Sequence, residues 1–296
     1  MNRQFHRVAI SLAAPLAALV LCGPALADGM PGRSRTVAPA QERCKLSANV
    51  ALATEYVFRG ISQTSEGPAV QGGADLTCGI FYAGVWASNL DWGGTGLYGF
   101  PGNSTVANIE MDWYAGIKPV TGRITWDLGV IYYSYPNSAR LGINALGVVD
   151  NRDYNYVELK VGASAELWKD ATIGATAFYS PDYQYEAGQV WTFEGAFTQN
   201  LPKFMLGREW TPSISALIGY QTAAGNLGDR TVYRLNVTGD ENNYLYWNVG
   251  FTLGFAEKWS IDFRYWDTNI DRPVVGCGPS LFACDERYVG TLKFTY

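Results

Sequence analysis

The chain ends with the segment Arg287-Tyr288-Val289-Gly290-Thr291-Leu292-Lys293-Phe294-Thr295-Tyr296. From Gly290 to Tyr296, small or apolar residues take every second position, and polar residues stand between them. A period of two is typical of a β-strand with one apolar and one polar face. The segment therefore predicts a final strand whose apolar face finishes with an aromatic side chain.

The same alternation recurs along the chain from residue 46 onward. It predicts twelve strands, at 46–60, 69–78, 80–90, 109–118, 123–134, 154–167, 171–180, 190–200, 210–222, 244–255, 259–266 and 287–296. The connections after the even-numbered strands are short, although 201–209 is longer than expected for such a turn. Most connections after the odd-numbered strands are longer and rich in Gly, Asn and Asp. Short turns at one end and long loops at the other are the pattern of an outer-membrane β-barrel.

The sequence thus predicts an all-β fold, a transmembrane antiparallel up-and-down β-barrel of about twelve strands. A secreted β-sandwich also alternates, but its apolar face would be aliphatic, whereas the faces here are rich in aromatic residues, as membrane-interface girdles are. A barrel also satisfies its backbone polar groups in lipid, which an open sheet cannot do. In a barrel the last strand closes against the first. The terminal Tyr296 suits recognition by the outer-membrane assembly machinery, which we expect as a partner together with outer-membrane lipid.

The N-terminal segment has the features of a cleaved signal peptide. Arg3 and Arg7 precede an apolar run from Val8 to Leu21, and Ala25-Leu26-Ala27 forms a cleavage site. A short membrane anchor is the alternative interpretation. We predict three parts, namely a signal peptide (1–27), a periplasmic segment (28–45) and the barrel (46–296), and we expect the protein in the outer membrane of a Gram-negative bacterium.

Composition excludes several classes of function. Of 22 Lys+Arg and 27 Asp+Glu, residues 1–27 contain two Arg and no acid, so the mature chain has 20 against 27, a net charge of −7. With no basic cluster, nucleic acid is not an expected partner. The one histidine, His6, lies in the signal peptide, so the mature chain lacks an imidazole for a catalytic pair or a metal site. We predict neither an enzyme nor a bound metal or cofactor.

The polar faces of the predicted strands carry the residues expected to line a pore. They are Glu55, Arg59, Glu110, Asp112, Lys118, Arg123, Asp127, Glu158, Lys160, Glu166, Glu194, Asp262, Arg264 and Lys293. Eight strands make a barrel that its own side chains fill, whereas sixteen leave an open channel, so twelve predict a narrow pore. These charges could select cations, as Glu110, Asp112, Asp127 and Glu158 would favour, or could pair across the lumen and brace the barrel.

Four cysteines remain after the signal peptide, Cys44, Cys78, Cys277 and Cys284. An even number in an exported protein predicts two disulfides. Cys44 precedes the first predicted strand and Cys78 ends the second, so both lie at the same rim. Cys277 and Cys284 share the last long loop. We therefore expect the pairs Cys44–Cys78 and Cys277–Cys284.

Several blocks in the first half of the chain resemble the TorF family of porins. They are 48–52, 55–64 (Glu-Tyr-Val-Phe-Arg-Gly-Ile-Ser-Gln-Thr), 68–73, 81–89 (Phe-Tyr-Ala-Gly-Val-Trp-Ala-Ser-Asn), 128–133 and 154–158. The resemblance covers residues 47 to 160 and implies a Gram-negative outer-membrane protein of channel type, without naming a substrate. The four cysteines depart from the family pattern.

Two functions follow from these observations. The first is a porin-like channel through which small polar solutes or ions diffuse passively. The alternative is a structural or adhesive barrel whose long external loops bind partners. Electrical conductance would distinguish them, since only the first requires an open path.

Overall fold

The structure is a computed structural model that describes residues 44–92, 107–136, 138, 142–143, 149–150, 154–184, 188–224, 243–270 and 283–296. The expected signal peptide and the segment 28–43 lie outside these residues. Among the described residues there is no helix long and apolar enough to cross a membrane.

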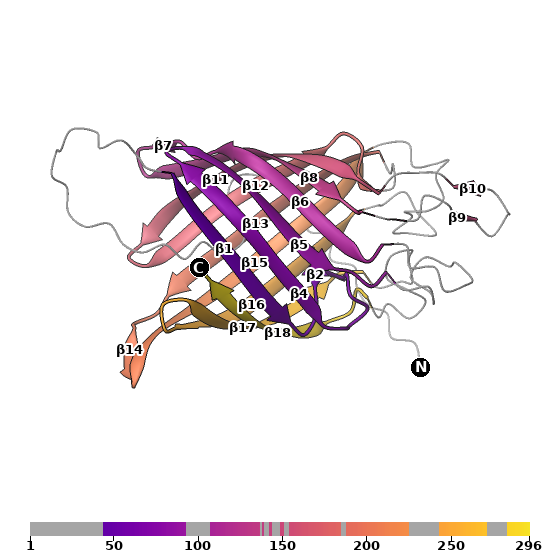
Figure 1. Cartoon of the computed structure of the whole chain (residues 1–296). Helices are drawn as coiled ribbons and strands as arrows, with labels where there is room; N and C mark the ends of the chain where they lie inside the picture. The colour runs from indigo at the N-terminus through magenta and orange to yellow at the C-terminus, as the bar shows by residue number, and fades with distance from the viewer. Residues whose placement is uncertain are drawn as a thin grey trace, which may run out of the picture.

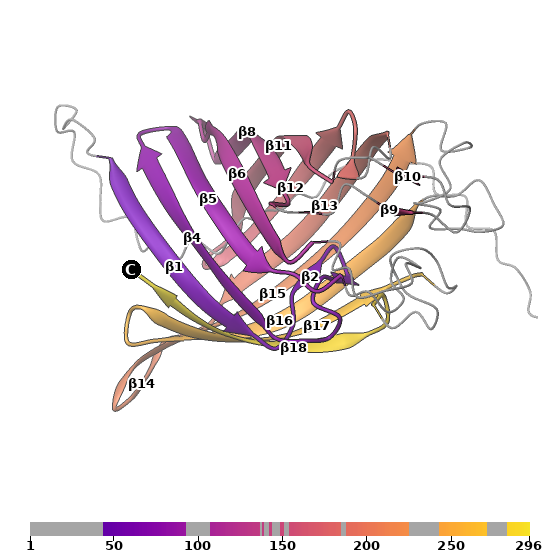
Figure 2. The same cartoon turned by 45° about the vertical axis from the view of Figure 1, so that its right-hand side comes forward.

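Antiparallel strands form a closed barrel (Figures 1 and 2). The main sheet has 14 strands, of which β7 and β14 only extend hairpins, so 12 strands form the ring. Ring neighbours follow one another along the chain, and β1 pairs with β18 to close it. The predicted twelve-strand barrel is confirmed. The ring strands are β1 (Lys45–Ala53), β4 (Ala69–Cys78), β5 (Phe81–Asn89), β6 (Ile109–Ile117), β8 (Ile124–Ser134), β11 (Tyr156–Trp168), β12 (Ala171–Ser180), β13 (Gln189–Asn200), β15 (Arg208–Ala224), β16 (Tyr244–Phe255), β17 (Trp259–Thr268) and β18 (Arg287–Thr295).

The prediction of the first strand is wrong for the second half of its range. The sequence predicts a strand over 46–60, but β1 ends at Ala53. Residues 54–60 continue the alternation of apolar and polar side chains, so the pattern alone does not reveal the end of the strand. The chain instead turns into the barrel and forms a small hairpin of β2 (Val57–Phe58) and β3 (Ile61–Ser62).

The ring closes through a short ladder between the first and last strands. Residues Asn49–Ala53 pair with Thr291–Thr295. Just beyond the ladder, the Thr54 amide donates to the Gly290 carbonyl at 2.9 Å, and the Gly290 amide donates to Thr54 Oγ1 at 3.0 Å. A side-chain hydroxyl thus satisfies a backbone donor of β18 at the point where β1 leaves the wall.

The two faces of the wall differ in polarity, as a membrane barrel requires. Large apolar side chains are exposed on the outside, among them Leu52, Val161, Phe193, Ile218 and Phe263. Polar and charged side chains at alternate positions point inward and are buried, among them Glu110, Asp127, Glu158, Thr192 and Asn248. The outer face thus matches lipid, and the inner face encloses the polar groups.

Aromatic rings lie near both ends of the outer wall. At the end with the short turns, a continuous row of ring contacts runs across neighbouring strands, through Phe204, Trp210, Phe255, Trp259 and Phe294. At the other end, the rings of Tyr265 and Tyr288 lie 5.3 Å apart, and those of Tyr179 and Trp191 lie 4.6 Å apart. These positions are those expected of membrane-interface girdles.

Four short strands lie in the described parts of the connections. β7 (Val120–Thr121) pairs with the start of β8, and β14 (Phe204–Leu206) pairs with the start of β15. The β14–β15 hairpin explains the unusual length of the connection 201–209, and it projects beyond the barrel at the end with the short turns (Figure 1). β9 (Gly142–Ile143) and β10 (Val149–Asp150) pair with each other.

One disulfide joins Cys44 and Cys78, whose Cα atoms are 4.3 Å apart, and this pair is confirmed. It links the start of β1 to the end of β4, so it closes the first two strands at the end with the short turns. Cys284 is also disulfide-bonded, whereas Cys277 lies outside the described residues. The expected pair Cys277–Cys284 therefore stays a prediction.

Replacing both cysteines of the first disulfide by Ala should lower the free energy of unfolding. The bond spans a sequence separation of 34 residues. The chain-entropy model assigns about 3–4 kcal/mol to a loop of this length. Urea unfolding of the refolded barrel in vesicles would measure the change between the oxidised wild type and the variant. Identical midpoints for the oxidised wild type and the variant would show that the disulfide adds nothing.

Candidate functional site

The hairpin between β1 and β4, defined as residues 54–68, is the main feature of the barrel interior. Arg59 and Gly60 form its turn, and both have positive φ, 50° and 83°. Two successive residues with positive φ are the requirement of a type I′ hairpin turn. A Cβ atom on Gly60 would lie 2.5 Å from Thr268 Cγ2 and 2.9 Å from Tyr246 Cβ. Glycine is therefore required both by the turn and by close packing against the inner wall.

The tip of the hairpin reaches the opposite side of the barrel. Arg59 Nη1 and Nη2 each donate to a carboxylate oxygen of Glu158 on β11 at 2.8 Å. The guanidinium also lies over the ring of Phe178 on β12, 5.1 Å from its centroid. Because β12 is the sixth strand from β1 in either direction around the ring, the hairpin crosses the whole lumen. Figure 2 shows β2 at the end of the barrel from which the long connections leave.

Charge pairing makes this burial possible. Arg59 is 5% exposed and Glu158 is 1% exposed. Burial lowers the pKa of Arg59, but the adjacent Glu158 carboxylate outweighs that effect and holds the pKa above its ordinary value. The fork-shaped, two-bond geometry is the strongest form of a charge-assisted hydrogen bond. Arg59 and Glu158 therefore form a fixed link between the hairpin and the far wall.

Further bonds hold the hairpin to other parts of the wall. Glu55 forms an ion pair with Arg287 on β18, and the Tyr56 hydroxyl donates to Glu110 on β6 at 2.9 Å. The Tyr244 hydroxyl on β16 donates to the Arg59 carbonyl at 3.2 Å. Strands on several sides of the ring thus bind the same hairpin.

Aromatic side chains fill the space around the hairpin. The rings of Tyr133 and Tyr156 stack at 4.3 Å, and Phe58 meets the Tyr133 ring edge-on at 5.9 Å. Tyr56 packs against Trp86 at 5.2 Å. The buried members of this cluster are Ala53, Tyr56, Ala69, Leu90, Trp92, Ala107, Tyr133, Tyr135, Tyr154, Tyr156 and Val289. The half of the lumen near the long connections is consequently packed by the hairpin and these rings.

The half near the short turns is held by ion pairs along the wall. Asp127 accepts hydrogen bonds from Lys160 Nζ at 2.7 Å and from the Tyr82 hydroxyl at 2.6 Å, and Lys118 Nζ lies 3.9 Å from it. Arg264 and Asp262 pair at 3.0 Å. These acids and bases neutralise one another within the wall.

Inward-facing glycines allow tyrosine rings to lie against the wall in this half. The Tyr82 ring occupies the space where side chains on Gly116 and Gly129 would stand, and the Tyr114 ring covers Gly84 in the same way. The Tyr114 hydroxyl donates to Asp75 at 2.5 Å. The rings therefore cover the wall instead of projecting toward the barrel axis.

The structure places the predicted residues in three settings. On the inner face of strands, or in the turn that follows β6, lie Glu110, Asp112, Lys118, Asp127, Glu158, Lys160, Glu194, Asp262, Arg264 and Lys293. Glu55 and Arg59 lie on the hairpin and not on a wall strand. Arg123 lies in the exposed turn before β8, and Glu166 is exposed near the end of β11.

Sequence reasoning missed the hairpin and the tyrosines that pack around it. Two features of the sequence could have indicated the hairpin, namely the length of the first predicted strand and the glycine within it. A strand of fifteen residues over 46–60 exceeds the roughly 9–11 residues that a membrane strand needs, and a glycine inside a strand pattern indicates a bulge or a close approach of backbone. Two tryptophans also pack inside the barrel: Trp86 occupies an inward position of β5, in phase with the buried Ser88, and Trp92 lies just beyond the end of the same strand.

One family model matches part of the chain. A family model described as a bacterial protein of unknown function (Gcw_chp) matches residues 37–146, which is less than half of the chain. The resemblance to TorF porins stays a prediction. No curated protein matches the sequence.

Several solved structures have a similar architecture at low sequence identity. KdgM porin is 8% identical, with 84% of this chain and 99% of that chain covered and a TM-score of 0.47. LpxR from Salmonella typhimurium is 9% identical, with 84% and 99% covered and a TM-score of 0.45. NanC porin is 9% identical, with 85% and 98% covered and a TM-score of 0.43. Similarities of this size identify neither a substrate nor an activity.

Replacing Gly60 by Ala should destabilise the barrel by about 2–4 kcal/mol, because it adds the strain of positive φ to a steric overlap. Gly122→Ala is the matched control, since Gly122 also has positive φ (62°) but has no atom within 4 Å of its would-be Cβ. Only the strain, about 1–2 kcal/mol, should remain there. Urea unfolding in vesicles would compare the two. Equal losses would mean that the hairpin tip does not pack against the wall.

Proposed function

We propose that the protein is an outer-membrane channel of the porin type, through which small polar solutes or ions diffuse along a narrow lumen. The observation that carries this proposal is the contrast between the two faces of a closed barrel. Large apolar residues cover the outside, whereas the inner face carries acids, bases and hydroxyl groups from nearly every strand. A polar lumen is typical of barrels that conduct water and solutes.

The hairpin sets the size limit of the proposed path. It crosses the lumen near the long connections, which face the outside of the cell in bacterial outer-membrane barrels. A solute arriving from outside would meet the hairpin before the half of the lumen near the short turns. The path would then pass beside the hairpin, which the ion pair between Arg59 and Glu158 holds against the far wall.

The alternative is a structural barrel with no conducting path. The packing around the hairpin favours it, because Tyr56, Tyr133 and Tyr156 are each less than 9% exposed. Both functions use the same fold, so only a transport measurement separates them.

Planar-bilayer recording of the refolded mature protein tests the proposal. The wild type should give small, discrete conductance steps, and Arg59→Ala should raise the conductance severalfold, because it releases the hairpin from β11. Lys203→Ala is the control, since the Lys203–Glu209 pair lies on the projecting β14–β15 hairpin outside the lumen. That variant should behave as the wild type. If neither the wild type nor Arg59→Ala conducts at any salt concentration, the structural function replaces the channel.

The channel should prefer cations at low salt. Among the ion pairs of the described residues, none includes Glu110 or Asp112, whereas Asp127 and Glu158 are paired with bases. Glu110→Gln with Asp112→Asn should therefore reduce the preference more than Glu166→Gln at the exposed rim. Screening should weaken the preference as the Debye length falls from about 30 Å at 0.01 M to about 3 Å at 1 M. Reversal potentials under a salt gradient measure it, and an anion preference in the wild type would contradict this assignment.

A further inference from the structure

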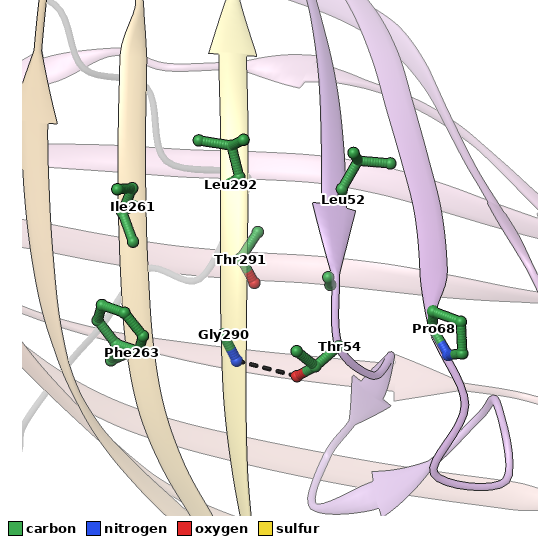
Figure 3. A pocket seen from close by; sticks show the side chains of 9 residues that line it. Leu52, Thr54, Pro68, Ile261, Phe263, Gly290, Thr291 and Leu292 are labelled. Carbon is green, nitrogen blue, oxygen red and sulfur yellow. Dashed lines mark hydrogen bonds between the residues drawn. The ribbon is translucent and has the colours of Figure 1, made fainter.

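A groove of about 410 Å³ lies on the outer wall at the seam between the first and last strands (Figure 3). Its floor is Gly290 on β18. Ile261 and Phe263 on β17 form one side, and Leu52 and Pro68 form the other. The groove is therefore apolar and opens toward the surroundings of the barrel, not toward the lumen.

The groove exists because the chain leaves the wall at this point. The ladder between β1 and β18 ends at the pair Ala53–Thr291, and beyond it Thr54 carries the chain toward the lumen. Gly290 faces outward, between the exposed Tyr288 and Leu292, and contributes no side chain. A missing side chain next to a departing strand leaves a hollow that the neighbouring strands do not fill.

We infer that this groove binds an acyl chain of an outer-leaflet lipid. It lies within the apolar band of the wall, since Leu52 is 57% exposed and Phe263 is 64% exposed. It also lies near the end with the long connections, just inside the Tyr265–Tyr288 ring pair that marks the interface. At this depth the surroundings are hydrocarbon, so a hydrocarbon chain is the occupant whose chemistry matches.

Packing, and not hydrophobicity, gives the groove its preference. Lipid tails are as apolar as leucine side chains, so moving a chain from lipid to a flat protein wall gains little. A concave wall surrounds the chain with atoms on more than one side and adds dispersion contacts that a flat wall lacks. The preference is consequently a matter of shape and depends on Gly290.

Gly290→Leu is the substitution that tests this dependence. A Cβ atom at this position would lie 3.7 Å from Thr54 Cγ2 and 3.8 Å from Phe263 Cε1, which is ordinary contact. A Cβ atom therefore fits at this position without displacing its neighbours, and the rest of the leucine side chain would extend into the groove. Ala216→Leu is the matched control, because Ala216 lies on β15 between the exposed Ile214 and Ile218 and is not among the residues that line this groove. A heat-dependent shift in gel mobility would verify that both variants fold.

The full mature protein is reconstituted in vesicles that contain a phosphatidylcholine with a diazirine in one acyl chain, irradiated, and mapped by peptide mass spectrometry. In the wild type, labelling at the groove residues Leu52, Phe263 and Leu292 should exceed that at Phe193, an exposed residue of β13, by about threefold, given the modest size of dispersion contacts. Gly290→Leu should bring it to the level of Phe193, and Ala216→Leu should leave it unchanged.

Equal labelling of the groove residues and Phe193 in the wild type would overturn the assignment, and so would a Gly290→Leu variant that keeps the excess. Gly290→Ala, which fills less of the groove, should give an intermediate excess and tests the same dependence if the leucine variant folds poorly. The inference needs only the place of the barrel in the membrane. A barrel without conductance would leave it intact, and a groove without lipid would leave the channel proposal intact.

Discussion

Backbone groups that face lipid have no water to bond with, so every strand of this barrel needs two neighbours. The pairing of β1 with β18 meets that requirement for the whole ring, because without it both strands would have an open edge. The ladder is short, from Asn49–Thr295 to Ala53–Thr291. The Thr54 hydroxyl extends it by bonding the Gly290 amide. This closure allows β1 to end early and lets the following residues enter the barrel.

The hairpin that enters the barrel carries charged side chains into the half of the lumen that is packed by aromatic rings, and charge pairing determines where these side chains lie. A buried ion pair is weak evidence for stability, because desolvation offsets much of the attraction, but leaving one partner alone is costly. Arg59 therefore has one favourable position, opposite Glu158, and Glu55 has one opposite Arg287. The two ion pairs fix the position of the hairpin across the lumen. The stacked rings of Tyr133 and Tyr156 supply apolar contact around it.

The sequence predicts the wall well because the wall follows a local rule. Strands over 69–78, 171–180 and 244–255 match β4, β12 and β16 at both ends, since alternation stops where the turns begin. The inward placement of Glu110, Asp127 and Glu158 follows from the same alternation. The identity of their bonding partners cannot be predicted in this way. Arg59 and Glu158, for example, are 99 residues apart and meet only because of the order of strands around the ring. The hairpin escaped prediction for a related reason, since Glu55, Tyr56, Phe58 and Arg59 alternate as a wall strand would.

The inward-facing polar groups are paired differently in the two halves of the lumen. Near the short turns, acids and bases pair along the wall, and rings such as Tyr82 lie flat where glycine leaves room. Near the long connections, the acids face a hairpin that offers few bases, so Asp112 Oδ1 and Glu194 Oε2 are buried without a hydrogen-bond partner in the described structure. The acids without a basic partner thus lie at the level of the hairpin, whereas acids and bases are paired near the short turns.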